Sequence, residues 1–486
     1  MIDYLYLEKY KENNRIEAKK ALGGLPKSIW ETYSAFANTI GGVILLGVEE
    51  LEDKTLKAMN LTNPEKLIKE FWDIVNNSNK VSVNILSNKD VTIENINGNN
   101  IVVIRVPRAG RNDRPVYIDS NPFSGTYRRN GEGDYKCTKD EVQAMTRDAS
   151  IKTQDMLVLD KMGLDVFDYD SVKRYRIRMK NYRPGHVWEE LEDIEFLYKL
   201  GAVGRGDDGN MHPTSAGLVM FGFEYEIVKE YPHYFLDYQE RLDDDTRWTD
   251  RIVSTSGDWS GNIYDFYFRV YNKITQDIKV PFKMDGGNRI DDTIVHKALR
   301  EALANCLINT DYYGRQGVVI VKDKKQITLS NPGGFRIDIE VAKIGGISDP
   351  RNATLIKMFN LIDIGERSGS GIPNIYNVWN KQGWAAPSII EKFDPERIEL
   401  ILPLGKTDTK KPTLKTDTKK TTLKSVTQKN AIIDYLTYNA EGRITDFENL
   451  LGLQKSRVKE LVYSLVNEGL VIAEGTIKNR VYKLKR

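Results

Sequence analysis

One short segment of this chain carries residue types that could do chemistry together: Arg300-Glu301-Ala302-Leu303-Ala304-Asn305. In a helix, Glu301 and Asn305 lie one turn apart on the same face, with apolar residues behind them. A carboxylate placed in this way can orient a water molecule. An amide oxygen can hold Mg²⁺, which prefers oxygen ligands. The pair therefore predicts a site for a magnesium-bound ligand.

Two glycine-bearing turns follow this helix in the chain. They are Asn331-Pro332-Gly333-Gly334 and the segment from Gly365 to Gly371. Glycine has no Cβ, so backbone N–H groups in such turns can approach phosphate oxygens closely. A paired Glu and Asn on a helix, followed by glycine turns, indicates an ATP site. An exposed helix face and an ordinary turn would show the same residues, but the agreement of several motifs favours the site.

Residues 291–404 resemble the Bergerat-type ATP-binding domain found in gyrase, histidine kinases and MutL. The closer likeness is to its bacterial variant, the divergent AAA ATP-binding regulators. The matching pieces are Arg300-Glu301-Ala302, Asn305, Asp311-Tyr312, Asn331 to Gly334, Arg351-Asn352 and Glu366 to Ile372. In two places the chain departs from the pattern. Asn309 stands where the family has His, and Asn331 replaces the aspartate that reads adenine in most Bergerat proteins.

The resemblance implies ATP and Mg²⁺ as cofactors, with Mn²⁺ as an alternative metal. It assigns Glu301 a catalytic role and Asn305 the role of magnesium ligand. The nucleotide-binding residues that it implies are Asn305, Asp311, Asn331, Gly333, Gly334, Arg351, Glu366, Gly369 and Gly371.

Composition places the chain among globular multidomain proteins. It has 486 residues, of which 40% are hydrophobic and 29% charged, and a formal net charge of +2. Residues 405–486 hold 17 Lys and Arg against 9 Asp and Glu, a charge of +8, so the remainder carries −6. A basic end of this kind points to a polyanionic partner. The two cysteines, Cys137 and Cys306, fit a reducing cytoplasm, and we expect neither an export signal nor a membrane span.

The order of patterns predicts an α/β multidomain chain. The predicted parts are an α+β domain over 1–150, a connecting α/β region over 151–290, an α/β sandwich over 291–404, a basic linker over 405–427 and a compact domain over 428–486. The linker repeats a nine-residue unit, at Lys406–Leu414 and again at Lys415–Leu423. It is too poor in apolar groups to form a core. It serves either as a spacer alone or as a spacer with added phosphate affinity.

The last 60 residues resemble a winged helix-turn-helix. Helices are expected over 431–438, 444–451 and 456–466, and a hairpin around Gly475-Thr476. In that family the third helix enters the DNA major groove and the wing touches the backbone. The matching basic residues are Lys455, Arg457, Lys459, Lys478 and Arg480. Winged helices also act as dimerisation or protein-docking modules, and that alternative stays open.

The segment from about Glu12 to Ala149 resembles the Schlafen AlbA-like domain, which is a nucleic-acid-binding fold. The matching pieces are Glu12 to Lys19, Ser34 to Gly42 with its A-F-A-N-T run, Gly47 to Glu50, Arg114 to Tyr117 and Tyr127-Arg128. In nuclease-active members three acidic residues hold the metal, at positions matched here by Glu12, Glu17 and Glu50. Glu12 and Glu17 could share a metal only if a turn separates them, since residues five apart on one helix diverge by about 140°.

Basic side chains in this domain are candidate contacts to a nucleic-acid backbone: Lys19, Arg108, Arg111, Arg114, Arg128 and Arg129. Such contacts would grip phosphates without reading bases. Ordinary solvated charges are the alternative for any one of them.

These observations together predict a cytoplasmic protein that binds ATP and nucleic acid and regulates transcription. A homo-oligomer is implied by the resemblance to Bergerat proteins. The rival hypotheses are a Schlafen-like metal-dependent endoribonuclease of an antiviral defence system gated by ATP, and a binding module in which ATP is structural. A helicase is excluded on sequence, because the chain has no G-x-x-x-x-G-K-[ST] phosphate loop.

Overall fold

The fold was analysed in a computed structural model of the whole chain. It describes residues 7, 10–243, 245–276, 278, 283–285, 288–290, 293–365 and 369–405, and in the C-terminal part 432, 435–436, 439, 441–451, 455–467, 471–474 and 481–484. The chain forms two compact units, residues 1–407 and 408–486. The architecture is mixed α/β and multidomain, as predicted. No helix in the described ranges is both long and apolar enough to cross a membrane.

The N-terminal part is built on a four-stranded sheet with the order β1-β2-β6-β5. β1 pairs with β2 in parallel, and the other pairs are antiparallel. Two hairpins, β3-β4 and β7-β8, complete its strands. The strands span β1 Ile16–Lys19, β2 Gly42–Leu46, β3 Val48–Glu50, β4 Leu56–Ala58, β5 Val91–Ile96, β6 Asn99–Val106, β7 Tyr127–Asn130 and β8 Gly133–Lys136. The helices span α1 Ile29–Asn38, α2 Pro64–Val75, α3 Pro122–Gly125 and α4 Lys139–Ala149.

The A-F-A-N-T run forms the buried end of α1, and its Asn38 ties three segments together. The Asn38 amide nitrogen donates to the carbonyl oxygens of Val116 (2.8 Å) and Tyr127 (3.0 Å). Its amide oxygen accepts from the N–H of Val116 (2.8 Å). Ser34, one turn earlier, donates to the same Val116 carbonyl and accepts from the N–H of Tyr127. Side chains of α1 thus provide hydrogen-bond partners for buried backbone groups of Val116 and Tyr127.

The helix α4 closes this part, and its first turn is capped by its own side chains. Thr138 and Glu141 form a capping box. The Thr138 hydroxyl accepts from the N–H of Glu141, and the Glu141 carboxylate accepts from the N–H of Thr138. This satisfies N–H groups that the first turn of a helix leaves without partners.

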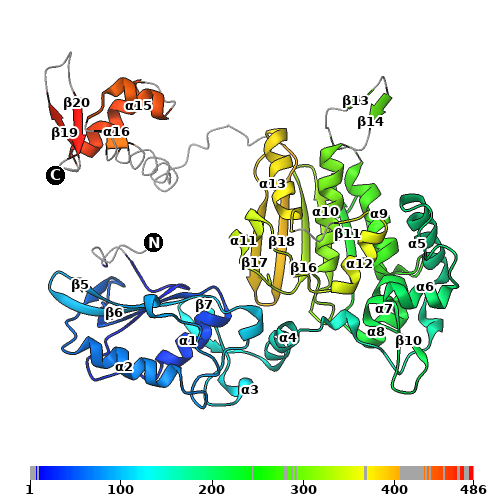
Figure 1. The fold of residues 1–486 in the computed structure, drawn as a ribbon, viewed down its shortest axis with the longest axis horizontal. Helices are drawn as coiled ribbons and strands as arrows, with labels where there is room; N and C mark the ends of the chain where they lie inside the picture. The colour runs from blue at the N-terminus through cyan, green and yellow to red at the C-terminus, as the bar shows by residue number, and fades with distance from the viewer. Residues whose placement is uncertain are drawn as a thin grey trace. The chain divides into compact units, whose positions relative to one another are not determined.

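The second part of this unit is one six-stranded sheet covered by helices (Figure 1). The strand order is β12-β11-β15-β16-β18-β17, and β11 pairs with β15 in parallel. The strands span β11 Leu236–Arg241, β12 Asp250–Val253, β15 Val318–Asp323, β16 Gln326–Pro332, β17 Ser388–Phe393 and β18 Glu396–Pro403. The boundary predicted at residue 290 therefore divides a single sheet, because β11 and β12 precede it and the other strands follow it.

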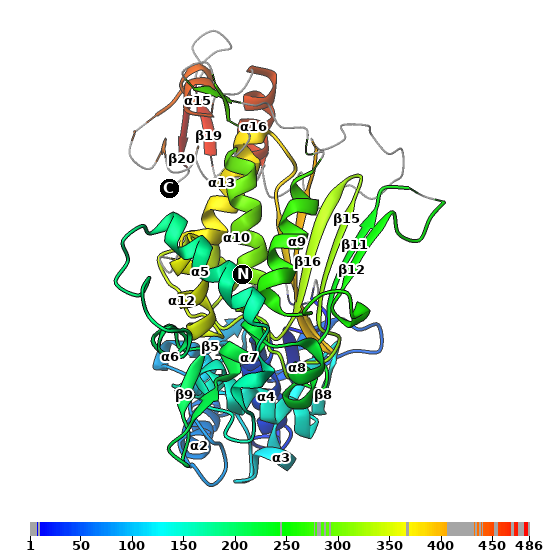
Figure 2. The same cartoon turned by 90° about the vertical axis from the view of Figure 1, so that its right-hand side faces the viewer.

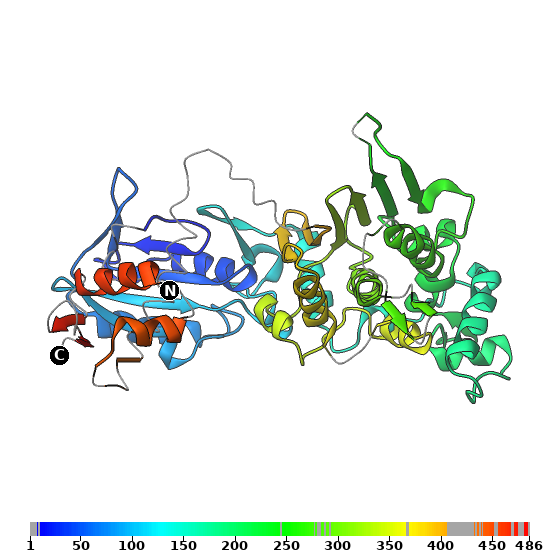
Figure 3. The same ribbon diagram turned by 90° about the horizontal axis from the view of Figure 1, so that it is seen from above.

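Three long helices lie side by side against this sheet (Figure 2). They are α9 Ile263–Thr275, α10 Ile294–Ile308 and α13 Gly371–Gln382, and Figure 3 looks along α9 and α10. One hydrophobic core runs from Leu159 to Leu402 and includes the fully buried Trp379 and Tyr267. The remaining elements are α5 Tyr169–Tyr182, α6 Asp193–Leu200, β9 Val203–Arg205, β10 Met211–Pro213, α7 Ser215–Phe221, α8 Glu224–Glu230, β13 Lys283–Asp285, β14 Asn288–Ile290, α11 Ile339–Ile344 and α12 Ala353–Leu361.

The C-terminal unit has its own small core, centred on Phe447, Val458 and Tyr482. Its described elements are α15 Ile444–Leu451, α16 Lys455–Asn467 and the antiparallel hairpin β19 Val471–Glu474 with β20 Val481–Leu484. Helices over 444–451 and 456–466 were predicted, and both are confirmed. The helix expected over 431–438 and the turn at Gly475-Thr476 fall largely or wholly outside the described residues.

Replacing Asn38 with leucine should destabilise the N-terminal part by about 3 kcal/mol, because each buried backbone group left without a partner costs about 1–3 kcal/mol. The measurement is the midpoint of urea unfolding, followed by intrinsic fluorescence. Asn95→Ala, at an exposed position of β5, is the matched control and should move the midpoint little. An unchanged midpoint in Asn38→Leu would show that the three hydrogen bonds do not hold this part together.

Candidate functional site

The helix α10 places Glu301 and Asn305 on one face, as their spacing predicts. The Asn305 amide nitrogen donates to Glu301 Oε1 at 3.2 Å. Both side chains are half-buried and line a pocket together with Ala302 and Cys306, while Leu303 is buried in the core. With Nδ2 committed to Glu301, the amide oxygen of Asn305 is the atom that can coordinate a hard cation.

The start of α13 approaches this pair closely because it begins with glycine. A Cβ at Gly371 would lie 2.4 Å from Glu301 Oε1 and 2.8 Å from Asn305 Nδ2. The first N–H groups of a helix have no partner within it and attract anions. The carboxylate, the amide and the N-terminal end of a 12-residue helix therefore meet at one point.

The glycine turn before α13 is bent by positive backbone angles. Gly365 and Gly369 have φ of +72° and +71°. A Cβ at Gly369 would also lie 2.5 Å from the carbonyl oxygen of Ile347. Glycine is thus required there for the turn itself. Glu366, predicted to bind the nucleotide, lies outside the described residues.

The pocket lies between α10, α13 and the sheet, and most of its wall is apolar. The apolar lining residues are Ala302, Ile308, Leu329, Phe335, Ile337, Ala342, Ile347, Ile356, Ile372, Ile375, Ile389, Ile398 and Leu400. Its polar groups include Glu301, Asn305, Asn309, Asn331 and Asp349. An apolar slot with a few placed polar groups is the usual form of a small-molecule site.

The Asn331-Pro332-Gly333-Gly334 turn ends β16 at the wall of this pocket. Asn331 is buried and lines the pocket, and its amide nitrogen donates to the carbonyl oxygen of Pro332 at 3.2 Å. The glycines differ from what was expected of them. A Cβ at Gly333 would lie 2.8 Å from Arg351 Nη2, and one at Gly334 would lie 2.3 Å from Glu396 Oε1. Here the missing Cβ makes room for charged side chains of this chain rather than for a phosphate.

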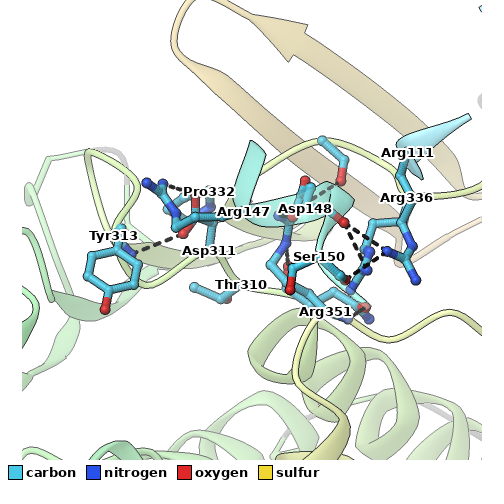
Figure 4. A network of polar contacts seen from close by, with 12 residues as sticks. Arg111, Arg147, Asp148, Ser150, Thr310, Asp311, Tyr313, Pro332, Arg336 and Arg351 are labelled. Carbon is cyan, nitrogen blue, oxygen red and sulfur yellow. Dashed lines mark hydrogen bonds and ion pairs between the residues drawn. The ribbon is translucent and has the colours of Figure 1, made fainter. Parts of the chain in front are cut away.

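Asp311 and Arg351, two further predicted nucleotide contacts, both face α4 of the N-terminal part. Arg351 lines the pocket, but its guanidinium forms an ion pair with Asp148. Asp311 forms an ion pair with Arg147 at 3.2 Å and is not among the lining residues. Figure 4 shows both pairs. No sequence motif pointed to Arg147 or Asp148, since neither belongs to a recognisable pattern.

Of the three predicted metal ligands of the N-terminal part, Glu17 and Glu50 act electrostatically on Glu12. A turn after Asn13 separates Glu12 from β1, and Glu12 Oε1 accepts from the N–H of Ala18 at 2.9 Å. Burial raises the pKa of Glu12, and the nearby carboxylates of Glu17 and Glu50 raise it further. Within the described ranges, however, no three acidic, His or Cys side chains are arranged to hold a metal ion.

The basic side chains of this part are engaged with its own acids. Arg129 is buried and pairs with Glu17 and Asp134, both at 2.8 Å. Lys19 pairs with Glu17 at 2.9 Å. Both basic groups are thus paired with acids of the chain, and this geometry gives no support to their predicted phosphate contacts.

Arg114 and Arg128 lie where the N-terminal part meets the six-stranded sheet. Arg114 is buried, and burial lowers the pKa of its guanidinium. Arg128 pairs with Glu141 at 3.0 Å and with Asp394 at 3.1 Å. Arg114 is buried, and the Arg128 side chain is 18% exposed and paired with two acids, so their predicted phosphate contacts find no support in this geometry. A sequence cannot separate arginines that meet a ligand from arginines that meet another part of the chain.

Among the basic residues predicted for the C-terminal unit, Lys455, Arg457 and Lys459 lie in α16, and Lys459 is exposed. Lys478 and Arg480 lie outside the described residues.

Family models match three successive segments of the chain. Residues 12–138 match the Schlafen AlbA_2 domain. Residues 317–400 match a model described as the C-terminal part of a putative ATP-dependent DNA helicase recG. Between them, residues 143–237 match a domain of unknown function. An AlbA_2-type domain and a RecG-like ATPase-type domain thus share one chain, which confirms the two resemblances at this coarser level.

Two solved structures are similar to parts or all of the chain. The DIP2311 protein from Corynebacterium diphtheriae covers 97% of this chain and 95% of its own, at 16% identity and a TM-score of 0.48. The N-terminal domain of a putative ATP-dependent DNA helicase RecG-related protein from Nitrosomonas europaea covers 28% of this chain and 95% of its own, at 27% identity and a TM-score of 0.22. No curated protein matches the chain.

Replacing Gly371 with alanine should weaken ligand binding in the pocket at least tenfold, which corresponds to about 1.4 kcal/mol. The added methyl group would push Glu301 and Asn305 apart or move α13 away from them. The measurement is calorimetric titration with a non-hydrolysable ATP analogue and Mg²⁺. Gly23→Ala, where no atom lies within 4 Å of the added Cβ, is the control, and equal affinities in both variants would contradict the geometry.

Proposed function

We propose that the chain is an ATP-binding, nucleic-acid-binding regulator in which binding of ATP with Mg²⁺ controls the arrangement of its domains or of its oligomer. The observation that carries the proposal is the meeting of Glu301, Asn305 and the glycine start of α13 at one end of an apolar pocket. The matches to an AlbA_2-type and a RecG-like ATPase-type domain support it.

The residues at this point fit a magnesium-bound triphosphate. Glu301 and Asn305 offer oxygen atoms, which hard cations prefer. Gly371 lets the start of α13 lie against Glu301 and Asn305, and the N-terminal end of that helix favours negative charge. Magnesium would neutralise phosphate charge when bound. Glu301, held by Asn305, is the group that can orient a water molecule for hydrolysis.

The apolar wall offers a surface for the flat face of a base. Ile337, Ile347 and Ile375 belong to it. Asn331 lines the pocket at the end of β16 and stands where the Bergerat pattern has aspartate, and we assign it to the edge of the base. This assignment of adenine to the β16 end of the pocket is part of the proposal.

The rival nuclease function has weaker geometric support. The carboxylates of Glu17 and Glu50 act electrostatically on Glu12 and help to raise its pKa, which is consistent with a shared acidic site. Glu17, however, is already neutralised by Lys19 and Arg129, and the acids in the described ranges do not form a metal cluster. Cleavage of tRNA or single-stranded RNA with Mn²⁺, lost in Glu17→Ala, would nevertheless establish it.

Substitutions of the α10 pair should separate binding from turnover. Asn305→Ala should lower the affinity for the ATP analogue at least tenfold in Mg²⁺ and much less in EDTA, because only the metal-dependent contacts involve the amide oxygen. Glu301→Gln should retain binding and reduce phosphate release by two orders of magnitude or more, about the range for loss of a general base. The measurements are calorimetric titration and a phosphate-release assay.

The wild-type chain provides the test of the proposal as a whole. A wild-type protein that fails to bind the analogue would exclude nucleotide control. Binding without any turnover, in both wild type and Glu301→Gln, would instead favour a structural role for ATP.

The basic residues predicted to contact DNA from α16 have their own test. Replacing Lys455, Arg457 and Lys459 with alanine should weaken binding of duplex DNA and flatten its salt dependence, since each lost phosphate contact lowers the slope of log K against log salt by about 0.9. Fluorescence anisotropy at several salt concentrations measures both. An unchanged slope would favour the alternative, in which this unit docks protein.

A further inference from the structure

One wall of the pocket is held from the N-terminal part of the chain. The wall consists of residues 333–336, after β16, and residues 349–351, before α12. We call these two segments the clamp wall. Gly334, Phe335, Arg336, Asp349 and Arg351 all line the pocket. Each of the two segments bonds to residues between 108 and 150.

Arg351 is the centre of this contact. Its Nη1 pairs with Asp148 near the C-terminal end of α4, while Nη2 donates to the carbonyl oxygen of Gly334 at 2.9 Å. The Arg351 side chain is 8% exposed and that of Asp148 is 14% exposed. A buried guanidinium needs a partner that stays in place, because its charge is costly away from water. Asp148 is therefore a structural requirement for the position of Arg351.

Two more arginines fix the same wall around the end of α4. Arg336 donates to the carbonyl oxygens of Pro350 (2.9 Å) and Asp148 (3.3 Å). Arg111 pairs with Asp349 at 2.5 Å and donates to the carbonyl oxygens of Asp148 (2.8 Å) and Ser150 (3.2 Å). The carbonyl groups that end a helix carry partial negative charge and favour cations. Figure 4 shows these guanidinium groups gathered at Asp148 and Ser150.

The segment 333–336 of the clamp wall is also held by an arginine of the N-terminal part. Arg108 binds Glu391 with both nitrogens, at 2.6 and 2.8 Å, and also donates to the carbonyl oxygen of Phe335. Glu391 in turn accepts from the N–H of Phe335 at 2.8 Å. The Glu391 side chain is 4% exposed, so this pair is as secluded as that of Asp148.

Asn309 links the clamp wall to the magnesium end of the pocket. Its amide nitrogen donates to the carbonyl oxygen of Asn305 at 3.0 Å. Its own carbonyl oxygen accepts from Arg351 Nε at 3.1 Å, and its amide oxygen accepts from the N–H of Arg351 at 3.3 Å. A continuous set of bonds thus runs from Asn305 through Asn309 and Arg351 to Asp148.

We propose that Asp148 is a positioning residue of the nucleotide pocket, through which the N-terminal part of the chain sets the affinity for nucleotide. This inference rests on the proposed function of the pocket and goes beyond it, because it makes the AlbA_2-type part a component of the site. Nucleotide binding and the order of α4 are then coupled in both directions, since linkage is reciprocal.

The test uses the full chain with Asp148→Asn. The matched control is Asp140→Asn, which breaks a pair with Arg315 that also joins α4 to the second part but is 67% exposed on both sides. Titration with the non-hydrolysable ATP analogue and Mg²⁺ gives the affinity. Hydrogen exchange with and without the analogue reports the order of the clamp wall and of residues 145–150.

Asp148→Asn should raise the Kd at least tenfold, and Asp140→Asn should change it less than twofold. In the wild type and in Asp140→Asn the analogue should slow exchange at residues 145–150, and this protection should vanish in Asp148→Asn. Wild-type affinity and protection in Asp148→Asn would overturn the inference. If Asp148→Asn does not fold, Arg111→Gln takes its place and should weaken binding in the same direction.

The same experiments distinguish a failure of this inference from a failure of the proposed nucleotide-binding function. In the latter case the wild type itself would not bind the analogue. Exchange without ligand would then decide the matter: faster exchange at 333–336 and 349–351 in Asp148→Asn than in Asp140→Asn supports the positioning role, and equal exchange overturns it.

Discussion

Burial of charge is the constraint on which the unit of residues 1–407 depends. Arginines 108, 114, 336 and 351 are withdrawn from water where its two parts meet, and so are Asp148, Glu391 and Glu396. Burial raises the pKa of Glu396, and the nearby Arg114 and Arg351 oppose that rise. Breaking one partner from such a group leaves an uncompensated charge, which costs about 3–5 kcal/mol. These ion pairs therefore hold the two parts in one arrangement, and the same pairs fix the position of the pocket wall that they form.

The glycines of the pocket serve two different purposes within this arrangement. Gly371 admits α13 to the Glu301 and Asn305 pair, where a ligand would bind. Gly333 and Gly334 instead admit the side chains of Arg351 and Glu396. Both uses exploit the missing Cβ, and only the surroundings distinguish them. A glycine-rich turn in a sequence therefore indicates close approach, without saying what approaches.

Local patterns of the sequence were reliable because their causes are local. The face shared by Glu301 and Asn305 follows from the helical repeat, and the cap of α4 follows from Thr138 and Glu141. The pairs Asp148 with Arg351 and Arg108 with Glu391 join residues 203 and 283 positions apart. No periodicity encodes such pairs. For the same reason Arg128 and Arg129 were expected at a phosphate, whereas the structure commits them to acids of the chain. The parallel pairing of β11 with β15 likewise carries the sheet across the boundary at residue 290, which was placed where the family resemblance begins.

The contacts of Asn309 give a physical role to a residue that differs from the pattern the sequence resembles. In the bacterial variant that residues 291–404 resemble, this position is His, and the sequence alone offered no role for the amide. Here the amide offers both a donor and an acceptor, and the backbone carbonyl adds a second acceptor, so one residue bonds to Asn305 and twice to Arg351. A neutral imidazole has one donor and one acceptor on a rigid ring, which fits this short connection less readily. Asn309 thus joins the end of the pocket that holds Glu301 and Asn305 to Arg351, which pairs with Asp148 of α4.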